Sequence, residues 1–349
     1  MRRLLLLLAM LQLLALVAVG CGDRRRDGFG ENEHLRVETF TQLDPMRSDV
    51  LWVIDSSQSM EDEQAALADN FPHFIAFFFE RDLSFRVAVT TTNFEDPDSD
   101  GLDGRFVGDP PWFDQDTVDL DNAFMERAIV GIDPGHRYEK GLAAAYGALA
   151  DPWPETEGFV REDAHLAIVV VSDEPDHSAR DFPDSDDFIS WEPFSAWLND
   201  FKGEGQVRMS DFSAVVGISP DGFEDPAGCG SEEDGGEWGP AEGAQRGDGY
   251  LEAAAATGGT YVSICEDDWS DMLARVGLIA SGMMDAFGLH EIPVVETLEV
   301  EVGTIRVSAW EYREHDNSIF FTTSDSVPEP GQVVRVTYEV PELPELPEE

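Results

Sequence analysis

The chain is poor in basic residues. Only 22 of its 349 residues are Lys or Arg, against 72 Asp or Glu, so the formal net charge is −50. Lysine is represented only by Lys140 and Lys202. Such a surface repels the phosphates of nucleic acid and the headgroups of anionic lipid. The charge balance therefore excludes nucleic acid as a partner. It leaves open whether the acidity attracts cations and basic partners or serves solubility in a salty environment.

Long apolar runs are also absent, except near the N-terminus. Residues 4–19 form a run of 16 apolar or nearly apolar positions, which follows Arg2 and Arg3. This run is shorter than the roughly 20 residues that span a bilayer. A basic start, an apolar middle and a small residue before Cys21 are typical of an export signal, so we expect cleavage after residues 1–20.

The segment LVAVGC, residues 16–21, resembles a bacterial lipobox. In that motif, small residues precede a cysteine that becomes the lipidated N-terminus. The resemblance implies palmitate-type lipidation at Cys21 and a protein anchored to the membrane of the cell envelope, on the periplasmic face or the cell surface. The alternative is an ordinary secretory cut beside an unmodified cysteine. Residues 21–47 are expected to be a polar linker from the lipid to the folded body.

Cysteine is scarce, with three in the whole chain. If Cys21 carries lipid, Cys229 and Cys265 remain as a natural pair in an oxidising compartment. A disulfide across the intervening 36 residues would stabilise the fold by about 4 kcal/mol through the entropy of the unfolded chain. Two free thiols are the alternative.

From residue 48 onward, apolar runs alternate with helical patterns. Continuous apolar strands separated by helices are typical of a mostly parallel sheet that is covered on both faces. We therefore predict an α/β fold with a doubly wound sheet over residues 48–284. Strands are expected at 50–54, 85–91, 164–171, 212–219 and 260–264, and helices at 61–80, 137–150, 186–201 and 269–284.

Beyond residue 285 the pattern changes to alternating apolar and polar residues with turns. This predicts a small antiparallel β module over 285–340. The final segment 341–349, PELPELPEE, repeats proline and acid and is expected to be extended or disordered.

Three oxygen-bearing side chains directly follow the first expected strand. Asp55, Ser57 and Ser59 lie at positions i, i+2 and i+4 of the stretch VIDSSQSM. In α/β sheets, ligands bind outside the carboxyl ends of strands, and carboxylate and hydroxyl oxygens suit hard cations such as Mg²⁺ or Mn²⁺. The alternative is that this loop only caps the helix that begins near Glu61.

This stretch resembles the Asp-x-Ser-x-Ser loop of the von Willebrand factor type A domain, which forms a metal-ion-dependent adhesion site (MIDAS). The resemblance covers about residues 48–284. It implies a further ligand after the fourth strand, which is Asp173 in VVVSDEPD. The family's middle ligand, usually threonine, falls on His136 in DPGHRYEKGL, with Glu139 as the nearest oxygen donor. Glu139 could replace it, His136 could replace it and favour softer ions, or fewer protein groups could hold the ion.

Two other acidic segments are candidate metal sites. The segment EDPDSDGLDG resembles D-x-D-x-D-G-x-x-D calcium loops, although an acidic surface loop is the alternative. His177 could join neighbouring acids of DEPDHS in a second metal site, but a solvated acidic loop is the favoured interpretation. The calcium candidates are Asp96, Asp98, Asp100 and Asp103.

The resemblance implies a binding protein, not an enzyme. A partner protein would offer a carboxylate to the open coordination position of the ion. A metal-dependent hydrolase is one alternative, in which Glu174 and the histidines are the available bases. A structural envelope scaffold with a degenerate metal site is another. The sequence has neither a Gly-x-Ser-x-Gly elbow nor a phosphate-binding loop with a lysine.

Overall fold

The computed structural model describes residues 34–43, 47–94, 101–133, 138–150, 152–178, 190–202, 209–230, 243–315 and 317–341. The export signal, Cys21 and residues 342–349 lie outside these ranges. Among the described residues, no helix is both long and apolar enough to cross a membrane.

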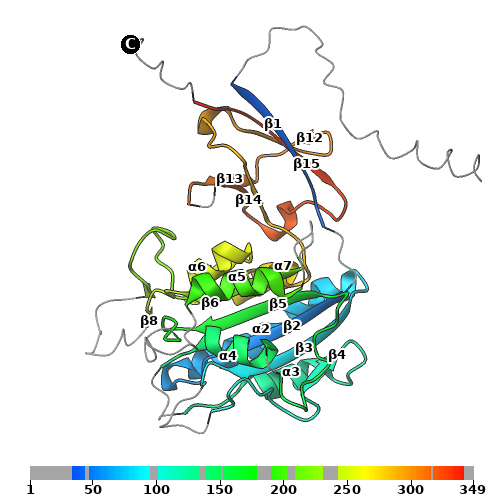
Figure 1. Ribbon diagram of the computed structural model, residues 1–349, viewed down its shortest axis with the longest axis vertical. Helices are drawn as coiled ribbons and strands as arrows, with labels where there is room; N and C mark the ends of the chain where they lie inside the picture. Colours follow the sequence, from blue (N-terminus) through cyan, green and yellow to red (C-terminus); the bar gives the residue numbers. More distant parts are fainter. Residues whose placement is uncertain are drawn as a thin grey trace, which may run out of the picture.

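A six-stranded sheet forms the centre of the larger part of the molecule (Figure 1). Its strands are β2 (Arg47–Ile54), β3 (Ser84–Thr91), β4 (Trp112–Asp114), β5 (His165–Ser172), β6 (Ser210–Val216) and β9 (Tyr261–Ser263). Their spatial order is β4-β3-β2-β5-β6-β9, and all neighbours are parallel except β3 and β4. When these six strands are numbered 1 to 6 along the chain, their order is 3-2-1-4-5-6, which is that of a doubly wound sheet. The predicted α/β fold is confirmed.

The central strands are buried on both faces. All eight residues of β5 are buried, and Trp52 and Leu51 of β2 face two separate apolar cores. A strand with two covered faces needs a continuous apolar run and cannot alternate with polar residues. This requirement explains why these strands were predictable from the sequence.

Helices cover each face of this sheet. The helices α2 (Glu61–Glu80), α3 (Leu120–Ala128) and α7 (Trp269–Ala280) contribute to the core on one face. The helices α4 (Gly141–Ala150), α5 (Trp191–Phe201) and α6 (Tyr250–Thr257) contribute to the core on the other. Aromatic rings fill the first core, where Phe71 stacks on Phe124 at 3.8 Å and Trp52 meets Phe74 edge-on at 4.9 Å between ring centroids. Such pairs add to the free energy of burying their area.

Helix α4 begins later than the sequence predicted, at Gly141 instead of near residue 137. Its first N–H groups are satisfied by another segment, since Leu142 N donates to Asp176 Oδ1 at 3.2 Å and Ala143 N donates to Ser178 Oγ at 3.0 Å. A helix start that is capped by a remote loop leaves no local sequence signal.

The small β module is antiparallel, which confirms that prediction, and Figure 1 draws it beyond the end of α7. Side chains from the end of α7 and just beyond, among them Ile279 and Met283, pack into its core with Val300 and Ile319. One sheet has the order β1 (Leu35–Thr41), β15 (Val333–Glu339), β11 (Glu299–Val302), β12 (Ile305–Arg306), and the other has the order β10 (Ala286–Gly288), β14 (Ser318–Phe321), β13 (Trp310–Arg313).

Strand β1 corrects the expectation of a linker over residues 21–47. Its seven residues pair with β15, from Leu35 opposite Glu339 to Thr41 opposite Val333. Phe40 packs against Phe287 with ring centroids 5.6 Å apart. The strand has few apolar residues and its partner lies near the other end of the chain, so its local sequence resembled a tether.

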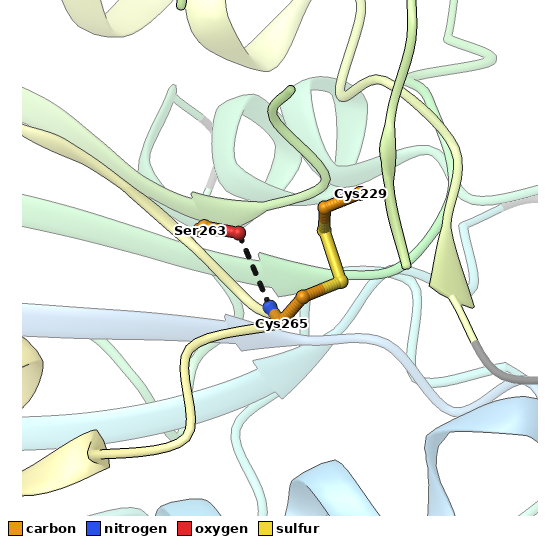
Figure 2. Close-up of a disulfide and its surroundings, with 3 residues drawn as sticks. All are labelled: Cys229, Ser263 and Cys265. Carbon is orange, nitrogen blue, oxygen red and sulfur yellow. Dashed lines mark hydrogen bonds between the residues drawn. A yellow bond between two sulfur atoms is a disulfide. The ribbon is translucent and has the colours of Figure 1, made fainter. Parts of the chain in front are cut away.

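The remaining short elements are η1 (Gln58–Met60), η3 (Val295–Thr297), η4 (Ser324–Ser326) and the pair β7 (Cys229–Gly230) and β8 (Gly243–Ala244). A disulfide joins Cys229 to Cys265, which confirms the predicted pairing, and Figure 2 shows it beside β9. The Cα atoms are 6.1 Å apart, within the usual range for a disulfide. The Cys265 N–H donates to Ser263 Oγ at 3.3 Å.

Candidate metal centre

The candidate site lies at the switch point of the doubly wound sheet. Strand order reverses between β2 and β5, and crevices at such points are the usual ligand sites of open α/β sheets. Asp55 follows β2 and Asp173 follows β5. Because the two strands are parallel neighbours, with Asp55 N donating to Val171 O at 2.9 Å, both aspartates lie at the same edge of the sheet.

A network of hydrogen bonds joins the predicted ligands. The fully buried Asp55 accepts from Ser57 N at 2.7 Å through Oδ1 and from Ser172 Oγ at 2.6 Å through Oδ2. The hydroxyls of Ser57 and Ser59 lie 3.2 Å apart, and Ser59 hydrogen-bonds to the carboxylate of Asp173. The structure thus brings Asp55, Ser57, Ser59 and Asp173 together.

The serine loop does not cap the following helix. The side chain of Ser57 makes no capping bond to η1, and the N-cap position of α2 is Met60, also without a side-chain cap. Buried Gln64 of α2 instead holds the loop, since its amide donates to Asp55 O at 2.8 Å and to Gly131 O at 3.1 Å. Gln64 therefore fixes the backbone of the loop, while the Ser59 hydroxyl contacts Asp173.

Burial raises the carboxyl pKa values in this cluster. Desolvation raises the pKa of Asp55 to about 6, although the bonds from Ser172 and Ser57 oppose the rise. Desolvation, followed by the charge of Asp55, raises the pKa of Asp173 to about 7. None of the described groups that act most strongly on these two pKa values carries a positive charge.

Glu139 lies against the same cluster and is only 1% exposed. Desolvation, followed by the charge of Asp55, raises its pKa to about 8. Among the described residues, Glu139 Oε2 and Asp173 Oδ1 are buried and have no hydrogen-bond partner. Buried carboxylate oxygens without donors are costly, and a divalent cation is the group that would satisfy them. The donor set therefore fits such an ion. His136, the other candidate for the middle position, falls outside the described residues.

Glu139 also belongs to a second cluster, with Glu174 and His177. One ligand atom of each lies within 4.8 Å of the others, and His177 Nδ1 is 3.4 Å from Glu139 Oε2. Desolvation, followed by the hydrogen bond and charge of Glu139, raises the pKa of Glu174 to about 8. Glu174 was not expected among the ligands of the serine-loop site, although its position directly after Asp173 was a signal.

The segment DEPDHS is not the solvated acidic loop that was favoured from the sequence. Asp176 is half-buried, and desolvation raises its pKa to about 6 while its carboxylate accepts from Leu142 N and Ser178 N. Its carboxylate oxygens are thus already used in hydrogen bonds at the start of α4. His165, in contrast, pairs with buried Asp211 at 2.5 Å at the other end of β5 and is structural.

The calcium-loop candidates cannot be placed together. Asp96, Asp98 and Asp100 fall outside the described residues, and Asp103 alone is described, with a left-handed φ of 50°. The calcium site stays a prediction, as does lipidation at Cys21.

No protein-family model matches the chain, and no curated protein does. Solved structures match at low identity. Proximal thread matrix protein 1 from the mussel byssus, with a zinc-occupied MIDAS motif, is 12% identical with a TM-score of 0.38, covering 70% of this chain and 48% of that one. The pilus adhesin SpaC from Lactobacillus rhamnosus GG is 12% identical with a TM-score of 0.35, covering 88% and 41%.

A conserved hypothetical protein, BatB from Bacteroides thetaiotaomicron, is 13% identical with a TM-score of 0.36, covering 67% of this chain and 99% of that one. The chain spans about half the length of the mussel structures that it matches. All these TM-scores are below 0.5, so the fold assignment rests on the strand order described above.

Proposed function

We propose that this protein binds a protein partner through a divalent cation held by Asp55, Ser57, Ser59 and Asp173. The observation that carries the proposal is the convergence of the buried Asp55, the half-buried Asp173 and two hydroxyls at the sheet's switch point, where the buried Asp173 Oδ1 has no hydrogen-bond partner among the described residues. Oxygen donors of this kind favour Mg²⁺ or Mn²⁺.

Each residue has a definite role in this proposal. Asp55 and Asp173 supply two negative charges, which balance a divalent ion, and the serines supply neutral oxygens. Such an ion supplies free coordination positions that a carboxylate can fill. Ser172 and the Ser57 N–H orient Asp55, at 2.6 and 2.7 Å. Binding would then depend on the cation and on an acidic side chain of the partner.

The proposed location is the bacterial cell envelope, reached by export and by a lipid on Cys21. This part of the proposal is supported by the N-terminal sequence alone. Mass spectrometry of the membrane-extracted protein would test it, because a diacylglyceryl cysteine adds mass to the peptide that begins at Cys21.

The binding proposal can be tested with the full chain in two steps. Isothermal titration with Mg²⁺ and Mn²⁺ measures ion binding directly. Pull-down of envelope and extracellular proteins is then compared in Mg²⁺, in EDTA and with Asp55→Ala. The matched control is Asp69→Ala, an exposed aspartate on α2. Partner binding that persists unchanged in all conditions would contradict ion-dependent capture.

A metal-dependent hydrolase is the second candidate, because Glu174 and His177 lie beside the site as available proton-transfer groups. Turnover of ester or phosphate substrates that disappears in Asp55→Ala would favour this candidate. If calorimetry detects no ion, a structural scaffold with a degenerate site becomes the better explanation.

A further inference from the structure

We propose that Glu139, Glu174 and His177 bind a second divalent cation of the zinc class, beside the ion proposed at Asp55. Their ligand atoms lie within 4.8 Å of one another. Glu139 is 1% exposed, and its Oε2, which faces His177, has no hydrogen-bond partner among the described residues. A nitrogen donor combined with two carboxylates suits zinc better than it suits Mg²⁺.

The spacing of two of these donors is that of a metal site. His177 Nδ1 and Glu139 Oε2 are 3.4 Å apart, longer than the roughly 2.9–3.0 Å of a usual N–H···O bond. Zinc lies about 2.0–2.1 Å from nitrogen and about 2.0–2.2 Å from oxygen, so two ligands at the tetrahedral angle are separated by roughly 3.4 Å. The pair is thus already placed along one edge of such a coordination shell.

The backbone holds the two ligand-bearing segments against each other. The backbone N–H of His177 donates to the backbone carbonyl of Glu139 at 2.7 Å, so a direct hydrogen bond holds these two ligand residues together. The residues on either side of His177 also bind the start of α4. Asp176 accepts a hydrogen bond from Leu142 N, and Ser178 accepts one from Ala143 N. The donors are therefore positioned before an ion binds, which lowers the conformational entropy that binding would cost.

The number of carboxylates at this edge of the sheet also favours two ions. Asp55, Asp173, Glu139 and Glu174 act on one another's charges. One divalent ion balances two of these four carboxylates. A second divalent ion balances the other two, and it also keeps the net charge near Asp55 from repelling an acidic partner.

Zinc binding by the full chain tests the proposal without any partner. Equilibrium dialysis against Zn²⁺, with Mg²⁺ in excess, would be followed by elemental analysis of zinc per chain. Cobalt would serve as a spectroscopic probe, because its visible absorption reports tetrahedral coordination. We expect His177→Gln and Glu139→Gln each to weaken zinc binding at least about 10-fold and to lose the cobalt band. Asp55→Ala should retain both.

The control variant is His73→Gln, which removes an exposed histidine from α2. Circular dichroism and the unfolding midpoint would establish that each variant is folded. Wild-type zinc affinity in both His177→Gln and Glu139→Gln would overturn the proposal. Equal loss of zinc in Asp55→Ala would overturn it as well, since it would mean one shared ion. Partner capture in Mg²⁺ is measured separately, so failure of the zinc site is distinguishable from failure of the proposed function.

Discussion

The buried carboxylate of Asp55 predicts an unusual effect of its removal on stability. Asp55→Asn keeps an oxygen to accept from Ser57 N but removes the charge. Burial raises the pKa of Asp55 from 3.8 to about 6. The protonated form therefore stabilises the folded state at low pH, and this stabilisation is lost as pH rises through about 6. At about 1.36 kcal/mol per pKa unit, the full loss is about 3 kcal/mol, of which about 1.4 kcal/mol falls between pH 5 and pH 8.

The assay is urea unfolding of the metal-free protein in EDTA at pH 5 and at pH 8. Any structural cost of the amide is the same at both pH values, so the difference isolates the charge. We expect the change in unfolding free energy caused by Asp55→Asn to be about 1.4 kcal/mol more favourable at pH 8 than at pH 5. Asp69→Asn, an exposed control on α2, should show no such difference. An Asp55→Asn effect that is equal at both pH values would refute the reasoning.

Three further outcomes are expected. Mg²⁺ at 100 times its Kd should raise the unfolding free energy by about 2.7 kcal/mol. Its affinity should fall from pH 8 to pH 5, because protons compete with the ion at Asp173, whose pKa is raised to about 7. A calorimetric affinity for Mg²⁺ that does not change with pH would contradict this. Cys229→Ser should lower the unfolding free energy by about 4 kcal/mol and remove any effect of reductant, and an unchanged urea midpoint would argue against a stabilising disulfide. Phe71→Ala should cost about 3–5 kcal/mol, since the ring is fully buried against Phe124, while Mg²⁺ affinity in the folded variant stays unchanged.

The elements that the sequence predicts well are those whose environment leaves a local signal. Strand β5 is an unbroken apolar run because both of its faces are covered. Asp55 and Asp173 were identifiable because each directly follows such a strand, and parallel neighbours end at the same edge. The Asp-x-Ser-x-Ser spacing then added the serines. These inferences need only a few residues and a general rule of sheet geometry.

The parts that the sequence did not predict depend on remote contacts. Helix α4 takes its cap from Asp176 and Ser178, which lie more than thirty residues later. The same contacts place His177 beside Glu139, and the sequence of neither segment alone predicts that these two side chains lie together. The short strand β4 has an edge position and only three residues, so its pattern is too brief to recognise.

The pairing of β1 with β15 has a consequence for synthesis. The last residue of β1, Thr41, pairs with Val333, and 333 − 41 = 292 residues separate them in the chain. At about 5–20 residues per second, the ribosome needs about 15–60 s to make that interval. β1 cannot pair with β15 before this interval has been made. The sheet that contains both strands therefore closes only after nearly all of the described chain has been synthesised.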